Sequence, residues 1–199
     1  LNDGALGGLL TLESYRKCSL NAAVRCLNDL TCEAVGAGAC SAGSGEVSLQ
    51  GRTLGSAEYP GGLIVRAGGD VRIGQRIQIS GNTLYSDGGT VDIDAGGSLF
   101  IDAPIEVNSG GEATGGEISL RGGVDVFVRA TVDAQGGDYD GGTIELSAGR
   151  DLLATASVNA DANTGEGFGG SLEVDAGRNI EVVGGTSSAN LFMTTEGHT

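Results

Sequence analysis

The segment Gly141–Leu153 reads GGTIELSAGRDLL, and a closely similar line, GGSLEVDAGRNIEV, returns at Gly169–Val182. Each line holds a glycine pair, an alternating strand, a small residue followed by Gly, and a second alternating strand. Repeats of about 20 to 50 residues built from short alternating strands are typical of a β-solenoid. The small-residue–Gly pairs mark the copies at intervals of 28, 27, 26 and 28 residues: Ala67-Gly68, Ala95-Gly96, Gly122-Gly123, Ala148-Gly149 and Ala176-Gly177.

A third alternating strand begins about ten residues after each marker. It is seen as Ile77/Ile79, Ile105/Val107, Val132/Ala134 and Val158/Ala160, and it fades at Thr186/Ser188. The sequence therefore predicts an all-β parallel β-helix with three short strands per coil of 26 to 28 residues. Because a repeat array grows along one axis and needs no second core, residues 1–199 are expected to form a single domain.

The array has an irregular beginning and end. Residues 7–14 match the opening of a repeat, with Leu10 and Leu12 facing inward and Ser14 in the place of the small marker residue. An insertion at 15–45 follows, and Val47-Ser48-Leu49 aligns with Ile77–Ile79 as a third strand. Residues 190–199 lie where a sixth first strand is due, so they are either a tail or the start of a further coil.

The insertion contains all four cysteines, Cys18, Cys26, Cys32 and Cys40. An even, clustered set predicts two disulfides and an oxidising compartment, whereas zinc ligands usually occur in pairs two to four residues apart. The segment Ser19–Asp29 has helical periodicity, so we expect a helical hairpin. If the first two cysteines share that helix, they are about 12 Å apart along it and the bridges are nested, first with fourth and second with third. If the segment is a loop, local bridges join the first two and the last two.

The composition bounds the class of protein. There are 38 Gly but only 2 Pro, which excludes collagen, and the glycines are expected at the corners of the coils with positive φ. The formal net charge of −15 disfavours nucleic acid and leaves basic surfaces and divalent cations as partners. No apolar run approaches the roughly 20 residues of a membrane span. The chain begins with Leu1, not Met, which suggests a processed product or an excised piece.

In these quoted lines the chain resembles the parallel β-helix repeats of bacterial exported adhesins, of the filamentous haemagglutinin and autotransporter-passenger kinds. The resemblance covers residues 60–199 well and 7–59 loosely. It implies export, an extracellular or cell-surface location, and a role in attachment or fibre formation. It implies no catalytic residues. The cysteine-bearing insertion and the lack of a translocation domain depart from those families.

Stacked coils place equivalent outward residues in columns about 4.8 Å apart. In the first strand we expect one column of mixed charge, whose alternating signs would fix the register, and one of carboxylates. The carboxylate column suggests a carbohydrate-active or glycan-binding β-helix as the alternative function. The members of the two columns are Arg66, Asp94, Arg121, Ser147 and Asp175, and Ile64, Asp92, Ser119, Glu145 and Glu173.

The outward column of the second strand contains Phe100, Phe127 and Leu153 on successive coils. This apolar strip is interpreted either as a surface for contact with a partner or as a ladder that stabilises the coil. Two short acidic runs, Asp138–Asp140 and Asp92–Asp94, are candidate Ca²⁺ ligands. They lack the pattern of calcium-binding solenoids, so solvated turns are the favoured interpretation and no cofactor is predicted.

The two ends of the array are the favoured place for function. Leu10 and Leu12 at one end, and Leu191, Phe192 and Met193 at the other, would leave apolar strand edges without a polar cap. We therefore predict a non-enzymatic structural or adhesive solenoid that assembles head to tail with copies of itself or with adjoining solenoid segments. A surface glycan or a protein receptor is a further candidate partner.

Overall fold

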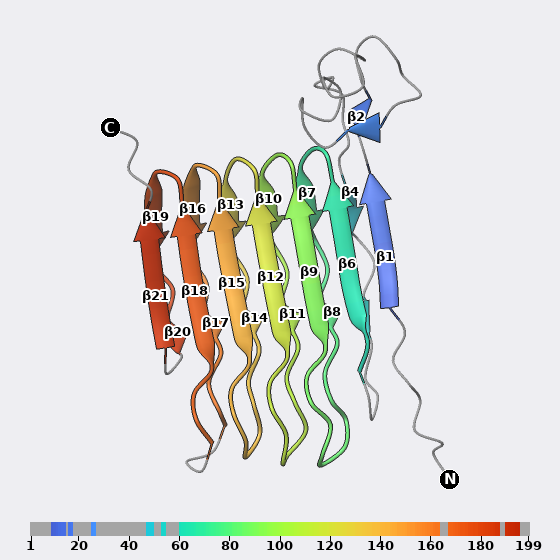
Figure 1. Ribbon diagram of the computed structural model, residues 1–199, viewed down its shortest axis with the longest axis vertical. Coiled ribbons are helices and arrows are strands. Elements are labelled where there is room, and N and C mark those ends of the chain that lie inside the picture. The colour runs from blue at the N-terminus through green and yellow to red at the C-terminus, as the bar shows by residue number, and fades with distance from the viewer. Residues whose placement is uncertain are drawn as a thin grey trace.

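The chain forms a parallel β-solenoid of about five coils (Figure 1). A computed structural model describes residues 9–14, 16–17, 25–26, 47–49, 53–54, 60–163, 167–187 and 190–195. Every coil passes through three sheets in turn, and each strand pairs in parallel with its equivalents one coil away. The predicted fold class, with three strands per coil, is therefore confirmed. None of the described residues belongs to a helix with the length and hydrophobicity needed to cross a membrane.

The first sheet has seven strands, all of six residues, and forms the broad face in Figure 1. Its strands in spatial order are β1 (Leu9–Ser14), β6 (Gly62–Ala67), β9 (Thr90–Ala95), β12 (Glu117–Gly122), β15 (Thr143–Ala148), β18 (Ser171–Ala176) and β21 (Asn190–Thr195).

The second and third sheets have six strands each. The second contains β4 (Val47–Leu49), β7 (Val71–Ile73), β10 (Leu99–Ile101), β13 (Val126–Val128), β16 (Asp151–Ala154) and β19 (Asn179–Val182). The third contains β5 (Thr53–Leu54), β8 (Ile77–Gln78), β11 (Ile105–Glu106), β14 (Val132–Asp133), β17 (Val158–Asn159) and β20 (Thr186–Ser187).

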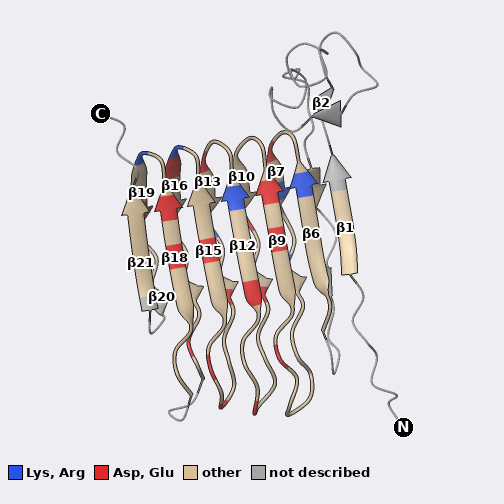
Figure 2. Cartoon of the chain, viewed as in Figure 1, with Lys and Arg blue, Asp and Glu red and all other residues tan. Residues whose placement is uncertain are grey.

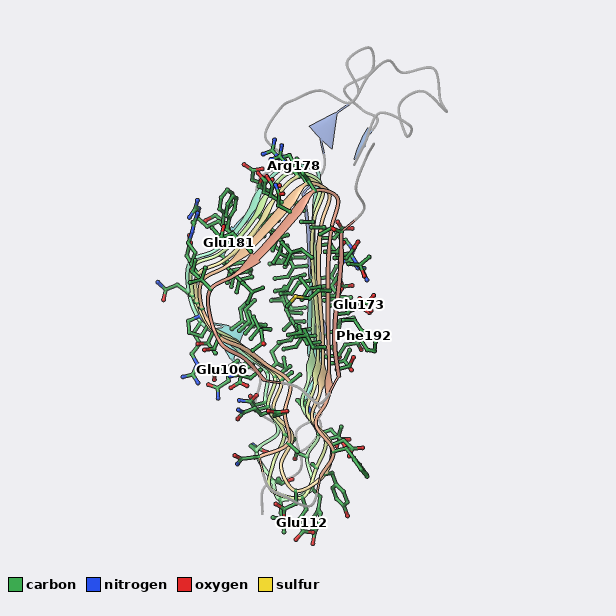
Figure 3. The ribbon with its side chains drawn as sticks, turned by 90° about the vertical axis from the view of Figure 1, so that its left-hand side faces the viewer. Glu106, Glu112, Glu173, Arg178, Glu181 and Phe192 are labelled. Atoms are coloured by element: carbon green, nitrogen blue, oxygen red, sulfur yellow. The ribbon has the colours of Figure 1, made fainter. Side chains whose placement is uncertain are left out.

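The alternating apolar residues all point into the solenoid, as the sequence predicts. In the inner coils the inward aliphatic side chains are almost wholly buried, for example Leu63, Ile101 and Ile144. The outward residues between them are mostly polar, charged or aromatic, with a few aliphatic exceptions such as Ile64 and Leu153, and they form the stacked columns seen end-on in Figure 3. The core is one continuous column of aliphatic side chains enclosed by the three sheets.

Glycine pairs lie where the chain passes from a strand of the third sheet to the next strand of the first sheet. There the Gly116 amide donates to the Val107 carbonyl at 2.8 Å, and the Gly142 amide donates to Ala134 at 2.8 Å. A Cβ on Gly142 would lie 2.2 Å from the Gly116 carbonyl oxygen. The expected positive φ is wrong at these two positions, because neither backbone is in the left-handed region. Glycine is needed there for the close approach of one backbone to another.

Long loops connect the third sheet to the first and stack on one another as a narrow projecting edge, at the bottom of Figure 3 around Glu112. We call residues 82–87, 109–114, 136–140, 161–163 and 167–168 the loop edge. Aspartates tie adjacent loops together: Asp87 Oδ1 accepts from the Thr114 amide at 3.0 Å, and Asp140 Oδ1 accepts from the Phe168 amide at 3.1 Å.

The beginning of the array differs from its predicted arrangement. The strand at β1 is confirmed, because Leu10 and Leu12 pair with Leu63 and Val65. The assignment of Val47–Leu49 as a third strand is wrong, since β4 pairs with β7 of the second sheet. The third strand of this coil is β5, which the sequence did not reveal. The insertion therefore separates the first and second strands of the coil.

Only two short strands of the insertion are described. β2 (Arg16–Lys17) and β3 (Arg25–Cys26) pair antiparallel, with Arg16 opposite Cys26. Residues 25–26 are thus extended, although the sequence places them in a helix. Cys18, Cys32 and Cys40 lie outside the described residues, so the disulfides and their pairing stay a prediction.

Candidate functional site

The predicted aromatic strip on the second sheet has the expected register. Phe100 lies opposite Phe127, and Phe127 lies opposite Leu153. The two phenyl rings stack with centroids 5.1 Å apart and planes 8° from parallel. Stacking along the solenoid axis turns the ring faces toward neighbouring coils and not toward solvent.

Two arginines cover the phenylalanine ladder. The Arg72 guanidinium carbon lies 4.5 Å from the Phe100 centroid, and that of Arg129 lies 5.0 Å from the Phe127 centroid. Asp102 pairs with both arginines, at 3.0 Å from Arg129 Nη1. The guanidinium groups therefore contact both the rings and the carboxylate within the chain. This favours the interpretation that the strip is a ladder that stabilises the coil. Contact of Phe100, Phe127 and Leu153 with a partner stays a prediction.

The two outward columns of the first sheet are also in the predicted register. Their charges pair between columns: Arg66 pairs with Asp92, and Arg121 Nη2 lies 2.9 Å from Glu145 Oε2. A small groove of about 210 Å³ lies beside Arg121, Glu145, Glu173 and Asp175. The face therefore offers hydrogen-bonding groups, but many of its charges are neutralised by neighbours.

The corner between the first and second sheets is fastened by a second row of ion pairs. Arg150 Nε donates to Asp125 at 2.8 Å, and Arg178 Nε donates to Asp151 at 2.8 Å. The hydrogen bond from Arg178 lowers the pKa of Asp151 to about 2, despite the opposing effect of desolvation. Each arginine follows the marker glycine of its coil, so these pairs link successive coils.

The third sheet places two carboxylates side by side. Glu106 and Asp133 are register partners, and Arg76 pairs with Glu106. Burial raises the pKa of the Asp133 carboxyl and the Glu106 charge adds to the rise, while a hydrogen bond from Asn108 Nδ2 at 3.2 Å opposes it. The other oxygen, Asp133 Oδ1, is buried without a hydrogen-bond partner among the residues described.

Replacing Asp133 with Asn should raise the melting temperature at neutral pH. The amide keeps an acceptor for Asn108 but carries no charge to desolvate or to repel Glu106. A raised pKa in the folded state means that ionisation of Asp133 opposes folding. The difference between variant and parent should therefore shrink as the pH falls through that raised pKa toward the usual value of 3.8. Thermal unfolding followed by circular dichroism at several pH values measures it.

The control is Asp138→Asn, the same chemical change on the exposed loop edge. It should leave the melting temperature almost unchanged at every pH. An Asp133→Asn variant less stable than the parent at neutral pH would contradict this account of the carboxylate.

Across the described segments, no group of three or more His, Cys, Asp or Glu side chains is arranged to hold a metal ion. The two acidic runs Asp92–Asp94 and Asp138–Asp140 lie within these segments. The structure therefore gives no support for a Ca²⁺ site at either run.

The two terminal strands of the first sheet carry the predicted assembly residues. Leu10 is 47% exposed, and at the other end Leu191 is 44% and Met193 46% exposed. Leu191 and Met193 lie in register with the buried Leu172 and Val174, so they occupy inward positions. Phe192 lies opposite Glu173 and points outward (Figure 3). The inward side chains are exposed because no further coil covers them within the described structure.

Sequence reasoning did not identify the loop edge as a site. Its large apolar side chains, Leu84, Tyr85, Tyr139 and Phe168, are each about half exposed or more. Strand periodicity does not extend into the loops, so it could not reveal them. The available signal was the presence of aromatic residues inside segments otherwise rich in Gly, Asn, Asp and Ser.

Comparison with known proteins gives the chain no relatives: no family model matches it, and no match was found among curated proteins or among solved structures. The class defined by the geometry is the parallel β-solenoid, with two terminal strands that no described residue covers, outward columns of paired charges and stacked rings, and an aromatic loop edge.

Proposed function

We propose that the chain is a non-enzymatic, exported structural or adhesive β-solenoid that assembles end to end. The observation that carries this proposal is the half-exposed inward apolar residues of the terminal strands. Export and an extracellular or cell-surface location are supported by the even, clustered set of four cysteines and by the resemblance to exported adhesins.

Each end of the described array presents the edge of a first-sheet strand, β1 at one end and β21 at the other. An edge strand offers a row of backbone donors and acceptors that can pair with another strand. If β21 of one copy pairs in parallel with β1 of the next, Leu191 meets Leu10 and Met193 meets Leu12, as in the register between inner coils. Because the two edges differ, such a contact is head-to-tail and propagates without closing.

The strand counts define the geometry of this contact. The first sheet has seven strands and the other two have six. Among the described strands, pairing of β21 with β1 therefore continues the first sheet and leaves each of the other two sheets one strand short at the joint. The joint accordingly depends on the first sheet and on Leu10, Leu12, Leu191 and Met193.

Replacing Met193 with Asp is expected to block assembly. The change places a charge at an inward position that the next copy would cover, where an unpaired carboxylate is costly. We expect elongated assemblies of the parent at high concentration and single particles of the variant, as measured by analytical ultracentrifugation.

The control is Thr155→Asp, which adds the same charge to an exposed position away from both ends. It should assemble as the parent does. Equal self-association of the parent and the Met193→Asp variant would contradict the proposed contact.

Glycan binding on the first sheet is the second candidate function. The groove beside Glu145, Glu173 and Asp175 favours it, because neighbouring carboxylates can accept hydrogen bonds from sugar hydroxyls. A glycan array and a reducing-end assay with the parent and with Glu173→Gln test it. Binding or turnover that is lost in Glu173→Gln would favour this function over a purely structural one.

A further inference from the structure

The loop edge exposes aromatic side chains along one side of the solenoid, on the loops that precede β9, β15 and β18. Among the described residues, large apolar side chains with high exposure occur in two places, the terminal coils and this edge. Tyr85 is 71% exposed, Tyr139 is 59% exposed and Phe168 is 80% exposed. Phe168 follows Tyr139 on the next coil, because its amide binds Asp140 and its carbonyl accepts from Gly141. Exposed aromatic groups that recur along one edge mark an interaction surface.

The same edge is acidic and contains no basic residue in its described loops. Its carboxylates take part in no ion pair of the described structure, and Figure 2 shows only acidic colouring along this edge. They are Asp87, Glu112, Asp138, Asp140 and Asp161.

The arginines of the solenoid are used elsewhere. Each arginine between residues 60 and 195 pairs with a carboxylate of the first, second or third sheet, or of the corner between the first two. They are Arg66, Arg72, Arg76, Arg121, Arg129, Arg150 and Arg178. The negative charge of the loop edge is therefore not neutralised by them.

The second sheet shows how this protein satisfies the same groups when arginine is present. There Arg72 and Arg129 stack on Phe100 and Phe127 while Asp102 pairs with both guanidinium groups. The loop edge has the aromatic ring and the carboxylate of that arrangement but not the cation. Tyr139 and Phe168 lie beside Asp138 and Asp140, as the phenylalanines of the ladder lie beside Asp102.

A polar groove borders the loop edge on the side of the third sheet. It encloses about 390 Å³ and is lined by Asn108, Gln135, Asn163, Asp138 and the backbone of Gly110 and Gly136. Asp138 contributes a carboxylate acceptor to this groove, and a guanidinium group has five N–H donors and no acceptor. The groove and the exposed aromatic rings therefore both suit a ligand that contains guanidinium groups.

We propose that the loop edge binds an arginine-rich segment of a partner protein. Guanidinium groups of the segment stack on Tyr139, Phe168 and Tyr85, and they pair with Asp138, Asp140 and Glu112. Arginine is favoured over lysine because its planar group stacks on rings and forms forked bonds to carboxylates. Anionic ligands, including nucleic acid, are repelled by the same charges. None of these residues belongs to β1 or β21, so the proposal does not depend on end-to-end assembly.

The test measures binding of a fluorescent peptide of alternating Arg and Gly, and of its Lys counterpart, by fluorescence anisotropy. The chain is used at concentrations at which it is monomeric. One variant combines Tyr139→Ala with Phe168→Ala, and a second combines Glu112→Gln with Asp138→Asn. The matched control combines Asp94→Asn with Glu117→Gln, which removes the same charge from the first sheet.

We expect the parent to prefer the Arg peptide and each loop-edge variant to weaken its binding about tenfold. The control should change it less than about twofold. Three results would overturn the proposal: no binding of the Arg peptide, equal weakening by the two carboxylate variants, or unchanged binding when both rings are removed. Equal weakening of peptide binding by the two carboxylate variants would mean that the net charge of −15 alone attracts the peptide. All substituted side chains are at least partly exposed, and circular dichroism verifies that each variant is folded.

Discussion

Replacing Ile101 with Asp is expected to lower the free energy of unfolding by on the order of 5 kcal/mol. Ile101 is fully buried in the middle of the second sheet, and its register partners are Ile73 and Val128. An aspartate there would place a carboxylate among aliphatic side chains with no cation in reach. Urea unfolding followed by circular dichroism measures the loss.

The matched control is again Thr155→Asp, which lies on the outer surface one residue after the register pair of Val128 and Ala154. It should shift the free energy of unfolding by less than about 0.5 kcal/mol. Similar losses in the two variants would mean that the assignment of inward and outward positions is wrong.

Replacing Gly142 with Ala should destabilise the chain by at least about 2 to 3 kcal/mol, although it adds a single methyl group. The new Cβ would lie 2.2 Å from the Gly116 carbonyl oxygen and 2.7 Å from that of Ala134. Both are backbone atoms held in the stack, so no side chain can move aside. Relief requires a shift of the hydrogen-bonded coils themselves.

Gly185→Ala tests whether this effect comes from close approach and not from the loss of a glycine. A Cβ at Gly185 would have one neighbour within 4 Å, the Ser157 Oγ at 3.8 Å. The variant should therefore be as stable as the parent, measured by the same urea unfolding. Equal destabilisation by the two substitutions would contradict the steric explanation.

The solenoid was predictable because its period is regular. A parallel stack repeats the same two-residue alternation in every coil, so aligning the markers also aligns columns such as Phe100, Phe127 and Leu153. The same alignment left residues 190–199 as either a tail or the start of a further coil, and Asn190–Thr195 forms β21, which pairs in register with β18. Inward and outward residues follow directly from the alternation.

The wrong predictions fall where the insertion interrupts the repeat or where a strand is too short for its alternation to identify its sheet. The alternation of Val47 and Leu49 fits a second strand as well as a third, and the insertion removes the marker that would count the position. The partner of each arginine depends on side-chain reach, which explains why Arg121 pairs with Glu145 of the neighbouring column. The loop edge follows no strand period, so the exposure of its aromatic side chains along one side became evident only in three dimensions.

Electron cryomicroscopy of the chain at rising concentration tests the central claim most directly. Seven strand spacings of about 4.8 Å give an expected axial repeat of about 34 Å between copies, because β21 and β1 each keep a place in the first sheet. Filaments with that repeat are the predicted result. Single particles at every concentration, or filaments whose repeat is about 29 Å, the length of six spacings, would contradict the pairing of β21 with β1.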